Sequence, residues 1–307
     1  MKILITGGAG FIGSHVLEHL QKYYPQEKIF VLDNLSSGNR AYVPASVELI
    51  EEDIRSKAVR SIFAHYNFDA VIHLAAQTMV PYSITHPAED ADINVAGLIN
   101  VLEASKDTKV KSVVFSSSAA VYGDNTNLPL QETEKLKPTS FYGITKMATE
   151  HYLRIYHDLF GINATVLRFA NVYGERQGMT GEGGVISIFV KKIAKGEPLE
   201  IFGSGEQTRD FIYVKDIACA LCLAVRHQGF GIFNVSTQQE VSINTLINIL
   251  EKLAACQAII KHLPPRNGDI FRSVLANSAL KEKLKMQDFT SLDKGLANTY
   301  HYFLTKK

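Results

Sequence analysis

The stretch Thr6-Gly-Gly-Ala-Gly-Phe-Ile-Gly13 follows a short apolar segment, Lys2–Thr6, and opens a helical pattern over residues 10–23. Glycines at positions 7, 10 and 13 allow a tight turn and a close approach of the backbone to a ligand. The amides of such a turn, together with the N-terminus of the following helix, face phosphate groups. Asp33 ends the next strand, where a carboxylate meets ribose hydroxyls. The stretch therefore predicts a Rossmann-type dinucleotide site.

The sequence around this stretch alternates short β-branched strands with helical segments, which is typical of parallel βαβ units. The fold class is accordingly α/β, with a Rossmann-type doubly wound parallel sheet and a smaller C-terminal substrate lobe. The expected strands of the first half are Lys2–Thr6, Ile29–Asp33, Val47–Glu51, Ala70–Leu74, Val113–Ser117 and Ala164–Phe169. The expected helices are 10–23, 59–65, 94–105 and Tyr142–Phe160.

Two lobes are expected, with a boundary near residue 170. Residues 1–170 would form the dinucleotide-binding domain, and residues 171–307 would mainly hold the substrate, although the chain can cross between the lobes. Within the second part we expect a helix that begins near Gly184, a strand at Leu199–Phe202, and helices around Leu246–Ala254 and Leu292–Phe303.

The bulk composition excludes several function classes. A formal net charge of +1 offers no electrostatic footprint for nucleic acid or a membrane surface. No apolar run reaches the roughly 18 residues of a spanning helix, and no signal-peptide pattern opens the chain. Three cysteines form no even disulfide framework, so a cytoplasmic location is expected. Cys219 and Cys222 lie in the apolar run Ile217–Val225 and are interpreted as buried helix residues rather than metal ligands; no metal site is expected.

Asp33 indicates the cofactor preference, because its carboxylate would bind the ribose hydroxyls and repel a 2′-phosphate. NAD is therefore favoured over NADP. Arg40 lies close by and leaves open a phosphate-accepting alternative. Asp53 and Ile54 follow the third strand, where they would meet the adenine edge or form a surface turn.

The segment Tyr142-Gly-Ile-Thr-Lys146 sets a phenol and an ammonium four residues apart, on one face of a helix. A nearby ammonium and a positive nicotinamide ring both favour the phenolate, which lets the tyrosine act as a base. Upstream, Ser116-Ser-Ser-Ala-Ala-Val-Tyr-Gly123 ends a predicted strand, at the sheet edge where ligands bind. Ser118 is the expected catalytic serine, with Ser116 and Ser117 as neighbours.

These motifs together resemble the NAD-dependent epimerase/dehydratase family of extended short-chain dehydrogenases, and within it the UDP-galactose (UDP-glucose) 4-epimerase branch. The resemblance continues through His73-Leu-Ala-Ala-Gln77, Arg168-Phe-Ala-Asn-Val-Tyr-Gly174, Gln207-Thr-Arg-Asp-Phe-Ile-Tyr213 and Arg266-Asn-Gly-Asp269. It implies catalytic roles for Ser118, Tyr142 and Lys146. It implies cofactor contacts from Gly7, Gly10, Phe11, Ile12, Gly13, Asp33, Asn34, Ser36, Ser37, Gly38, Asp53, Ile54, Leu74, Ala75, Ala76, Gln77, Asn94, Ser116, Tyr142, Lys146 and Ala170.

The resemblance also implies a site for a UDP-sugar substrate. Its expected residues are Ser118, Tyr142, Asn171, Val185, Ile186, Ser187, Glu200, Ile201, Phe202, Arg209, Arg266, Asp269 and Ser273. Of these, 200–202 would surround uracil, while Arg209 and Arg266 would hold the diphosphate, for which guanidinium forks have the matching geometry. As alternatives, Arg209 would pair with Asp210 or Asp216, and Arg266 would be a solvated turn residue.

The implied reaction is 4-epimerisation of a UDP-hexose. Tyr142 would take the 4′-hydroxyl proton while hydride passes to NAD, and the 4-keto sugar would turn over before hydride returns. A 4,6-dehydratase begins in the same way but needs a further acid, and Ala119 and Ala120 stand where such enzymes carry one. Decarboxylation is disfavoured for the same reason. A non-catalytic NAD-binding regulator is the third reading, disfavoured by the intact Tyr142 and Lys146 pair.

Substrate breadth and oligomeric state depend on the resemblance alone. Ser273, four residues after Asp269, is small, whereas a tyrosine there would crowd an N-acetyl group. Acceptance of UDP-N-acetylglucosamine and its galacto epimer is therefore expected beside UDP-glucose and UDP-galactose. A homodimer is expected, with 94–106 and Tyr142–Phe160 as the candidate contact helices.

Overall fold

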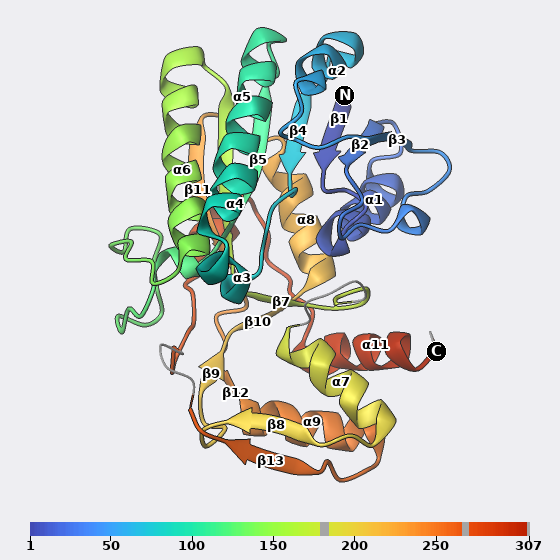
Figure 1. The fold of residues 1–307 in the computed structure, drawn as a ribbon, viewed down its shortest axis with the longest axis vertical. Helices are drawn as coiled ribbons and strands as arrows, with labels where there is room; N and C mark the ends of the chain where they lie inside the picture. Colours follow the sequence, from blue (N-terminus) through green and yellow to red (C-terminus); the bar gives the residue numbers. More distant parts are fainter. Residues whose placement is uncertain (179–183, 266–269, 306–307) are drawn as a thin grey trace.

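The computed structural model describes residues 1–178, 184–265 and 270–305. Its centre is a seven-stranded sheet in the order β11-β6-β5-β4-β1-β2-β3, with every neighbouring pair parallel (Figure 1). The strand bounds are β1 Lys2–Thr6, β2 Lys28–Asp33, β3 Glu48–Glu51, β4 Ala70–His73, β5 Ser112–Ser118, β6 Asn163–Phe169 and β11 Phe230–Val235. This is the doubly wound, Rossmann-type sheet that the sequence predicts.

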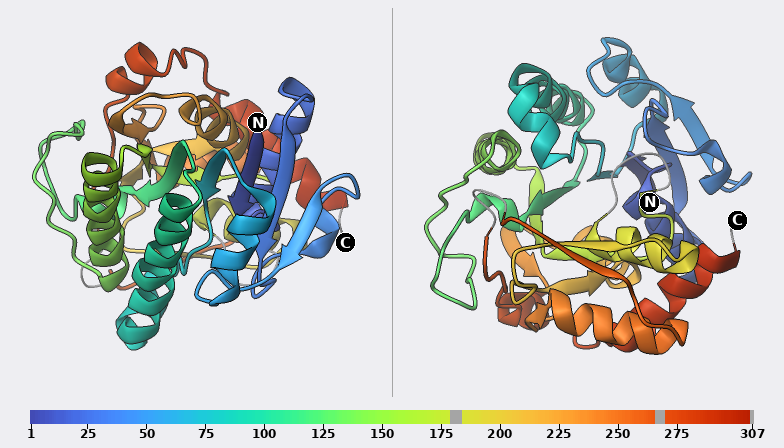
Figure 2. Two further views of the ribbon diagram at one scale, coloured as in Figure 1. Left: turned by 90° about the horizontal axis from the view of Figure 1, so that it is seen from above. Right: turned by 60° about the horizontal axis from the view of Figure 1, so that its bottom comes forward.

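Helices cover both faces of the sheet, as the view from above shows (Figure 2). One face packs against α1 (Phe11–Tyr23), α8 (Val214–Ala224) and α10 (Ser278–Lys283), and the other against α2 (Ala58–Tyr66), α5 (Gly97–Asp107) and α6 (Phe141–Phe160). Because both faces are covered, consecutive strand residues are buried, as in a purely parallel sheet. Ile3, Leu4 and Ile5 are fully buried, and the burial of each side chain contributes roughly 1.5–3 kcal/mol to the free energy of folding.

Short helical turns connect these elements near one edge of the sheet. Their bounds are η1 Arg40–Tyr42, α3 Val80–Thr85, α4 Pro87–Ala91, the π-helical turn η2 Asp92–Ala96 and η3 Ala119–Val121. A π-helical turn lets one helix change phase, and such turns are frequent at functional sites.

The second lobe is built from short strand pairs and three helices below the sheet (Figure 1). Its strands are β7 Asn171–Tyr173 with β10 Phe211–Tyr213, β9 Thr208–Arg209 with β12 Val241–Ser242, and β8 Leu199–Phe202 with β13 Ile260–Leu263. Its helices are α7 Val185–Lys195, α9 Ile243–Ala254 and α11 Leu292–Thr305. These elements share a separate apolar core.

The two lobes do not correspond to two consecutive stretches of chain. After β10 the chain returns to the first lobe, where α8 packs against α1 and β11 extends the sheet beside β6. Residues 275–286 also contribute to the core of the first lobe. A single boundary at residue 170 therefore does not separate the lobes, because β11 and residues 275–286 belong to the first lobe. Across the described ranges, none of the helices has the length and apolarity to cross a bilayer.

Candidate functional site

The expected site lies where the carboxyl ends of the parallel strands face the second lobe (Figure 1). Loops after β1, β4, β5 and β6 meet at this edge, which is where open α/β sheets bind ligands. The segments that follow β1 and β4 contain the glycine loop and Leu74–Gln77, and Ser118 is the last residue of β5. The topology thus gathers motifs that are far apart in the sequence.

The glycine loop leaves no room for side chains at two of its positions. Gly7 has a φ of +71°, and a Cβ there would lie 2.7 Å from the Ala75 nitrogen. A Cβ on Gly13 would lie 2.4 Å from the Gly7 carbonyl oxygen and 2.6 Å from the Gly8 Cα. Gly10 precedes the first residue of α1, so the helix N-terminus opens at the loop. A backbone cradle of this kind fits a pyrophosphate.

Asp33 lies beside this cradle, with its side chain buried. Its Oδ2 accepts a hydrogen bond from the Ala9 amide at 2.9 Å, and its Oδ1 accepts one from the Leu35 amide at 2.9 Å. Burial raises its pKa, while these two amide bonds act in the opposite direction. Each oxygen keeps further acceptor capacity for a ribose hydroxyl. The alternative phosphate acceptor, Arg40, is ion-paired with Glu51.

The expected adenine edge is an exposed polar cluster. The Asp53 carboxylate accepts bonds from Asn34 Nδ2 at 2.9 Å and from Arg55 Nε at 2.9 Å, and the Arg55 bonds lower its pKa to about 2. Ile54 points the other way, into the apolar core, so its side chain is unavailable to a ligand. Ser36, Ser37 and the half-buried Gly38 follow Asn34 on the surface.

The loop after β4 is joined to η2 by a reciprocal pair of hydrogen bonds. Asn94 Oδ1 accepts from the Gln77 amide at 2.9 Å, and Asn94 Nδ2 donates to the Gln77 carbonyl at 3.0 Å. Earlier in the loop, the Ala75 amide donates to the Thr6 hydroxyl at 3.3 Å. Leu74, Ala75, Ala76 and Gln77 are all half-buried. Asn94 therefore fixes the backbone of the segment rather than pointing freely into the site.

The three serines at the end of β5 have different partners. The Ser116 hydroxyl donates to the His73 carbonyl at 3.1 Å, and the Ser117 hydroxyl donates to Glu150 Oε1 at 2.5 Å. Of these three hydroxyls, only that of Ser118 acts on the Tyr142 phenol, whose pKa it lowers. The structure thus brings together Ser118 and Tyr142, while it turns Ser117 toward the protein interior.

Tyr142 and Lys146 lie one turn apart near the start of α6, which begins at the N-cap Ser140. Lys146 Nζ lies 5.7 Å from the centre of the Tyr142 ring and donates to the Ser116 carbonyl at 2.9 Å. Burial raises the pKa of Tyr142 to about 12 and lowers that of Lys146 to about 8. In the protein alone the phenol is therefore harder to ionise than the residue spacing suggests, because burial outweighs the effect of Ser118.

The second lobe brings Asn171 close to the start of α7. A small pocket is lined by Asn171, Tyr173, Val185, Ile186 and Phe211, among others. The side chain of Ile186 is buried in the lobe core, and the Ser187 hydroxyl donates to the Gly184 carbonyl at 2.9 Å. Both residues can therefore meet a ligand only through their backbone.

The remaining substrate residues lie around β8 and β9. Glu200 is exposed and pairs with Lys192 at 3.4 Å, whereas Ile201 is buried in the core and Phe202 is half-buried. Arg209 and Ser273 are half-buried. Arg266 and Asp269 lie outside the described residues. Ala170, at 9% exposed, follows β6 at the edge of the sheet.

The two carboxylates suggested as partners of Arg209 are engaged elsewhere. Asp210 accepts bonds from the Thr237 hydroxyl at 2.8 Å and from the amides of Thr237, Gln238 and Leu275. Asp216 accepts from Thr290. Neither carboxylate forms an ion pair with Arg209 among the described residues.

Sequence reasoning missed a set of buried polar residues behind the site. Asp90 accepts from Gln77, Asn94 and Thr145, and Glu150 forms an ion pair with Arg168 at 2.6 Å. Helical spacing was the available signal, because Asp90 precedes Asn94 by one turn and Glu150 follows Lys146 by one turn.

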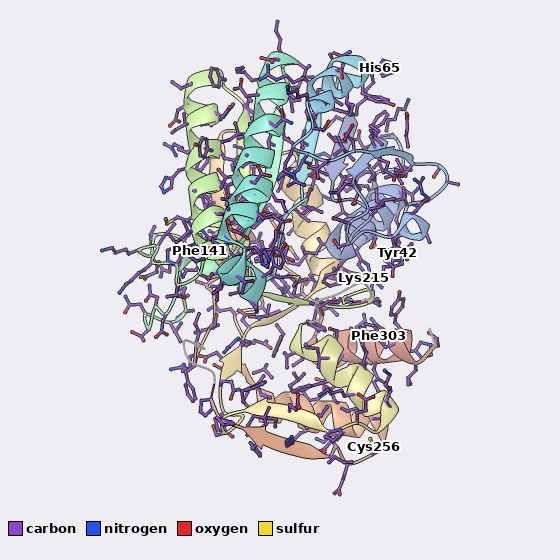
Figure 3. All side chains as sticks on the ribbon, in the orientation of Figure 1. Tyr42, His65, Phe141, Lys215, Cys256 and Phe303 are labelled. Atoms are coloured by element: carbon purple, nitrogen blue, oxygen red, sulfur yellow. The ribbon has the colours of Figure 1, made fainter. Side chains whose placement is uncertain are left out.

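The cysteines are free thiols in three settings. Cys222 is buried and Cys219 half-buried on α8, where burial raises the pKa of both thiols. Cys256 is exposed at the outer end of the second lobe (Figure 3). Over the described part of the chain, no cluster of three or more histidine, cysteine or acidic residues is arranged to hold a metal ion.

Comparison with known proteins gives consistent matches over the whole chain. The model of the NAD dependent epimerase/dehydratase family matches residues 3–236. UDP-glucose 4-epimerase of Mycolicibacterium smegmatis is 34% identical, covering 100% of this chain and 99% of the relative. UDP-glucose 4-epimerase of Thermotoga maritima, solved with UDP-glucose, is 40% identical with a TM-score of 0.95, covering 99% of this chain and 98% of that one. UDP-N-acetylglucosamine 4-epimerase of Methanobrevibacter ruminantium, solved with UDP-N-acetylmuramic acid, is 35% identical with a TM-score of 0.94, covering 100% and 99%.

Proposed function

The chain belongs to the NAD dependent epimerase/dehydratase family, and from that premise we propose that it catalyses the reversible 4-epimerisation of a UDP-hexose. The observation that carries this proposal is that the Ser118 hydroxyl acts on the Tyr142 phenol, with the Lys146 ammonium one turn further along α6. A base, a proton-sharing hydroxyl and a cation are the groups that proton removal from a sugar hydroxyl requires. They lie at the sheet edge that faces the second lobe.

The glycine loop and Asp33 would bind NAD, which when bound reversibly accepts hydride from the sugar carbon. Tyr142 would take the proton of the 4′-hydroxyl and return it when the configuration is inverted. Ser118 would hold that hydroxyl and share its proton, and Lys146 would orient the nicotinamide ribose and favour ionisation of the phenol. Asn171 and the backbone at 185–186 would contact the uridine diphosphate, and Arg209 would contact its phosphates.

Dehydration is disfavoured by the residues after Ser118. Elimination of water needs an additional acid beside the sugar, whereas residues 119–121 are the apolar turn η3, Ala-Ala-Val. The Tyr142 and Lys146 pair likewise disfavours a purely binding role. The same reaction mixture distinguishes these functions, because a dehydratase would release a 4-keto-6-deoxy sugar nucleotide.

The half-buried Ser273 supports acceptance of N-acetylated sugars, because its side chain is too small to crowd the 2′ substituent. We expect purified protein to convert UDP-galactose and UDP-N-acetylgalactosamine to their gluco epimers without added reductant, as followed by chromatography. The Ser273→Tyr variant should lose the acetylated substrate selectively, and Ser273→Ala is the matched control. Equal activity of Ser273→Tyr on both substrates would reject this role, and the absence of any epimer would reject the reaction.

A homodimer is the proposed assembly, with α6 at its centre. The outward face of α6 carries Phe141, Ile144, Tyr152, Ile155 and Leu159, which are 38–69% exposed and spaced by three, four or eight residues. The label on Phe141 marks the end of this face nearer the second lobe (Figure 3). A two-fold axis brings the same face of a second copy against it, so that both apolar rows are covered.

Light scattering after size exclusion tests this assembly. Wild-type protein should elute as a dimer, and Ile155→Glu should elute as a folded monomer, because a charge would be buried at the contact. Ile260→Glu, a change on exposed β13, is the matched control and should leave the dimer intact. A monomeric wild-type protein would contradict the assignment.

A further inference from the structure

Asp90 is a buried acidic residue behind the proposed catalytic pair. It lies in α4, and its side chain is 0% exposed. Its Oδ1 accepts from Gln77 Nε2 at 2.6 Å and from Asn94 Nδ2 at 3.2 Å, while its Oδ2 lies 2.9 Å from the Thr145 hydroxyl. Neutral donors thus face both oxygens, which suits an ionised carboxylate.

No ion pair reaches Asp90 directly within the residues that the structure describes. A buried carboxylate without a cation is costly, so the positive charge that offsets it must lie close by. Thr145, its hydrogen-bond partner, stands directly before Lys146 on α6. Lys146 is itself only 2% exposed, and its charge interacts with that of Asp90.

The other charged or titratable groups around Lys146 are accounted for. Glu150, one turn further along α6, is paired with Arg168 of β6. His73 of β4 is fully buried, and burial lowers its pKa to about 3, so it is neutral at ordinary pH. Tyr142 is a phenol in the protein alone. Asp90 is therefore the one described acid near Lys146 whose charge is not already paired.

We propose that Asp90 is a positioning residue of the catalytic centre, which acts through Thr145 as the buried counter-charge of Lys146 and which ties the Gln77 and Asn94 cofactor loop to α6. The inference rests on the proposed function for its kinetic consequence. The charge pairing can be tested on the protein without substrate.

The charge of Asp90 affects both members of the catalytic pair in the same direction. A negative charge favours the protonated form of a neighbour, and Asp90 accordingly raises the pKa of both Tyr142 and Lys146. Activity requires Tyr142 to lose its proton and Lys146 to keep its own. Removing the charge should therefore move the acid and alkaline limbs of the pH profile together, toward lower pH.

Asp90→Asn removes the charge and can keep the hydrogen bonds. The new Oδ1 would still accept from Gln77 and Asn94. The new amide would donate to the Thr145 hydroxyl, whose hydrogen can turn to the Tyr142 carbonyl 3.0 Å away. Glu89→Gln, one residue earlier on the same helix and exposed, is the matched control for loss of a carboxylate.

The first measurement is kcat/KM for UDP-galactose across pH. For Asp90→Asn we expect both limbs to shift to lower pH, with at least about a threefold loss at a fixed pH on the alkaline limb, since half a pH unit corresponds to that factor. The pH profile of Glu89→Gln should superimpose on that of the wild-type protein. A uniform loss of activity with unmoved limbs would mean that Asp90 is only structural, and would overturn the proposal.

A second measurement needs neither substrate nor cofactor. Titration of ¹³Cε-labelled lysine by NMR, with Lys146→Met to assign the resonance, should give a midpoint for Lys146 near its pKa of about 8. The midpoint should fall in Asp90→Asn, and an unchanged midpoint would overturn the charge pairing even if the protein proved not to be an epimerase. If Asp90→Asn alone does not fold, the test is whether the double variant Asp90→Asn with Lys146→Met folds. Recovery of folding supports the pairing, and failure of the double variant overturns it.

Discussion

The buried ion pair between Glu150 and Arg168 gives the sharpest test of how the catalytic helix is held. The two side chains are 4% and 3% exposed, and Arg168 donates to Glu150 through Nε at 3.0 Å and Nη2 at 2.6 Å. Arg168 Nη1 also donates to the Tyr122 hydroxyl at 2.9 Å. The pair therefore joins α6 to β6 beneath the site, and Ser117 binds the same carboxylate.

Glu150→Gln should destabilise the protein strongly, because it leaves the Arg168 guanidinium buried without an anion. Removing one partner of a buried ion pair lowers the free energy of unfolding by about 3–5 kcal/mol. Arg154 and Asp158 provide a matched control on the same helix, since their charged groups also pair directly, at 2.9 Å, but the side chains are 56% and 50% exposed. Asp158→Asn should lower the free energy of unfolding by only about 0.5 kcal/mol or less, because water screens an exposed pair.

Urea unfolding followed by far-UV circular dichroism measures both variants, and the chain contains no tryptophan to serve as a fluorescent probe. The protein concentration must be the same for each variant, because assembly of subunits would add to the measured stability. Replacing both partners, as in Glu150→Gln with Arg168→Met, should recover part of the loss. The reasoning would be refuted if Glu150→Gln cost no more than Asp158→Asn.

The remaining predictions concern the phenol, the glycine loop and a buried histidine. Tyr142→Phe should lower kcat by about 10²–10⁴, the usual contribution of a general base, while NAD affinity measured by calorimetry stays near that of wild type; activity within tenfold of wild type would exclude Tyr142 as the base. Gly13→Ala should weaken NAD binding by about tenfold or more, because its Cβ would lie 2.4 Å from the Gly7 carbonyl and overpacking costs about 1–3 kcal/mol; an unchanged dissociation constant would contradict the cradle. His73 has a folded-state pKa of about 3, below its ordinary 6.5, so its contribution to stability is present above pH 6.5 and is lost as pH falls through the window from 6.5 to 3. Unfolding free energy should therefore drop by about 1.4 kcal/mol for each pH unit below 6.5 from this group, and His73→Gln should lack that slope in urea titrations at pH 7, 6 and 5; equal slopes would show that His73 charges freely in the folded state.

Local patterns in the sequence were sufficient for most of the sheet. The expected strand Lys2–Thr6 matches β1, and the strand ending at Asp33 and the helix ending at Phe160 have the predicted ends in the structure. These segments are long or strongly patterned, and caps mark their boundaries, such as Ser140 before α6 and Gly161 after it. β11 (Phe230–Val235) was missed, because Gly231 interrupts its pattern and its place at the edge of the sheet, beside β6, depends on a segment far away in the sequence.

The roles of individual site residues depended on contacts that no local pattern encodes. The sequence shows three identical serines at the end of β5 and cannot rank them. In the structure, alternation along β5 and the neighbouring elements give Ser116, Ser117 and Ser118 different partners, which are His73, Glu150 and Tyr142. The predicted ionisation of Tyr142 depends on the Lys146 ammonium and a bound nicotinamide ring together, and in the protein alone burial raises the pKa of the phenol. Asp90 was absent from the predicted site, although it lies one helical turn before Asn94.

The sequence alone determined most of the strands and helices of the first lobe, the glycine cradle, and the phenol and ammonium on one helical face, because each depends on neighbours within a few residues. Only the tertiary structure decided which residues share the buried volume behind that face. Asp90 lies on α4, Thr145 and Glu150 lie on α6, and Arg168 lies on β6. Their exclusion from water makes the charges among them interact strongly. Burial is a property of the assembled fold, so the electrostatics of the site could be known only once α4, α6 and β6 were packed together.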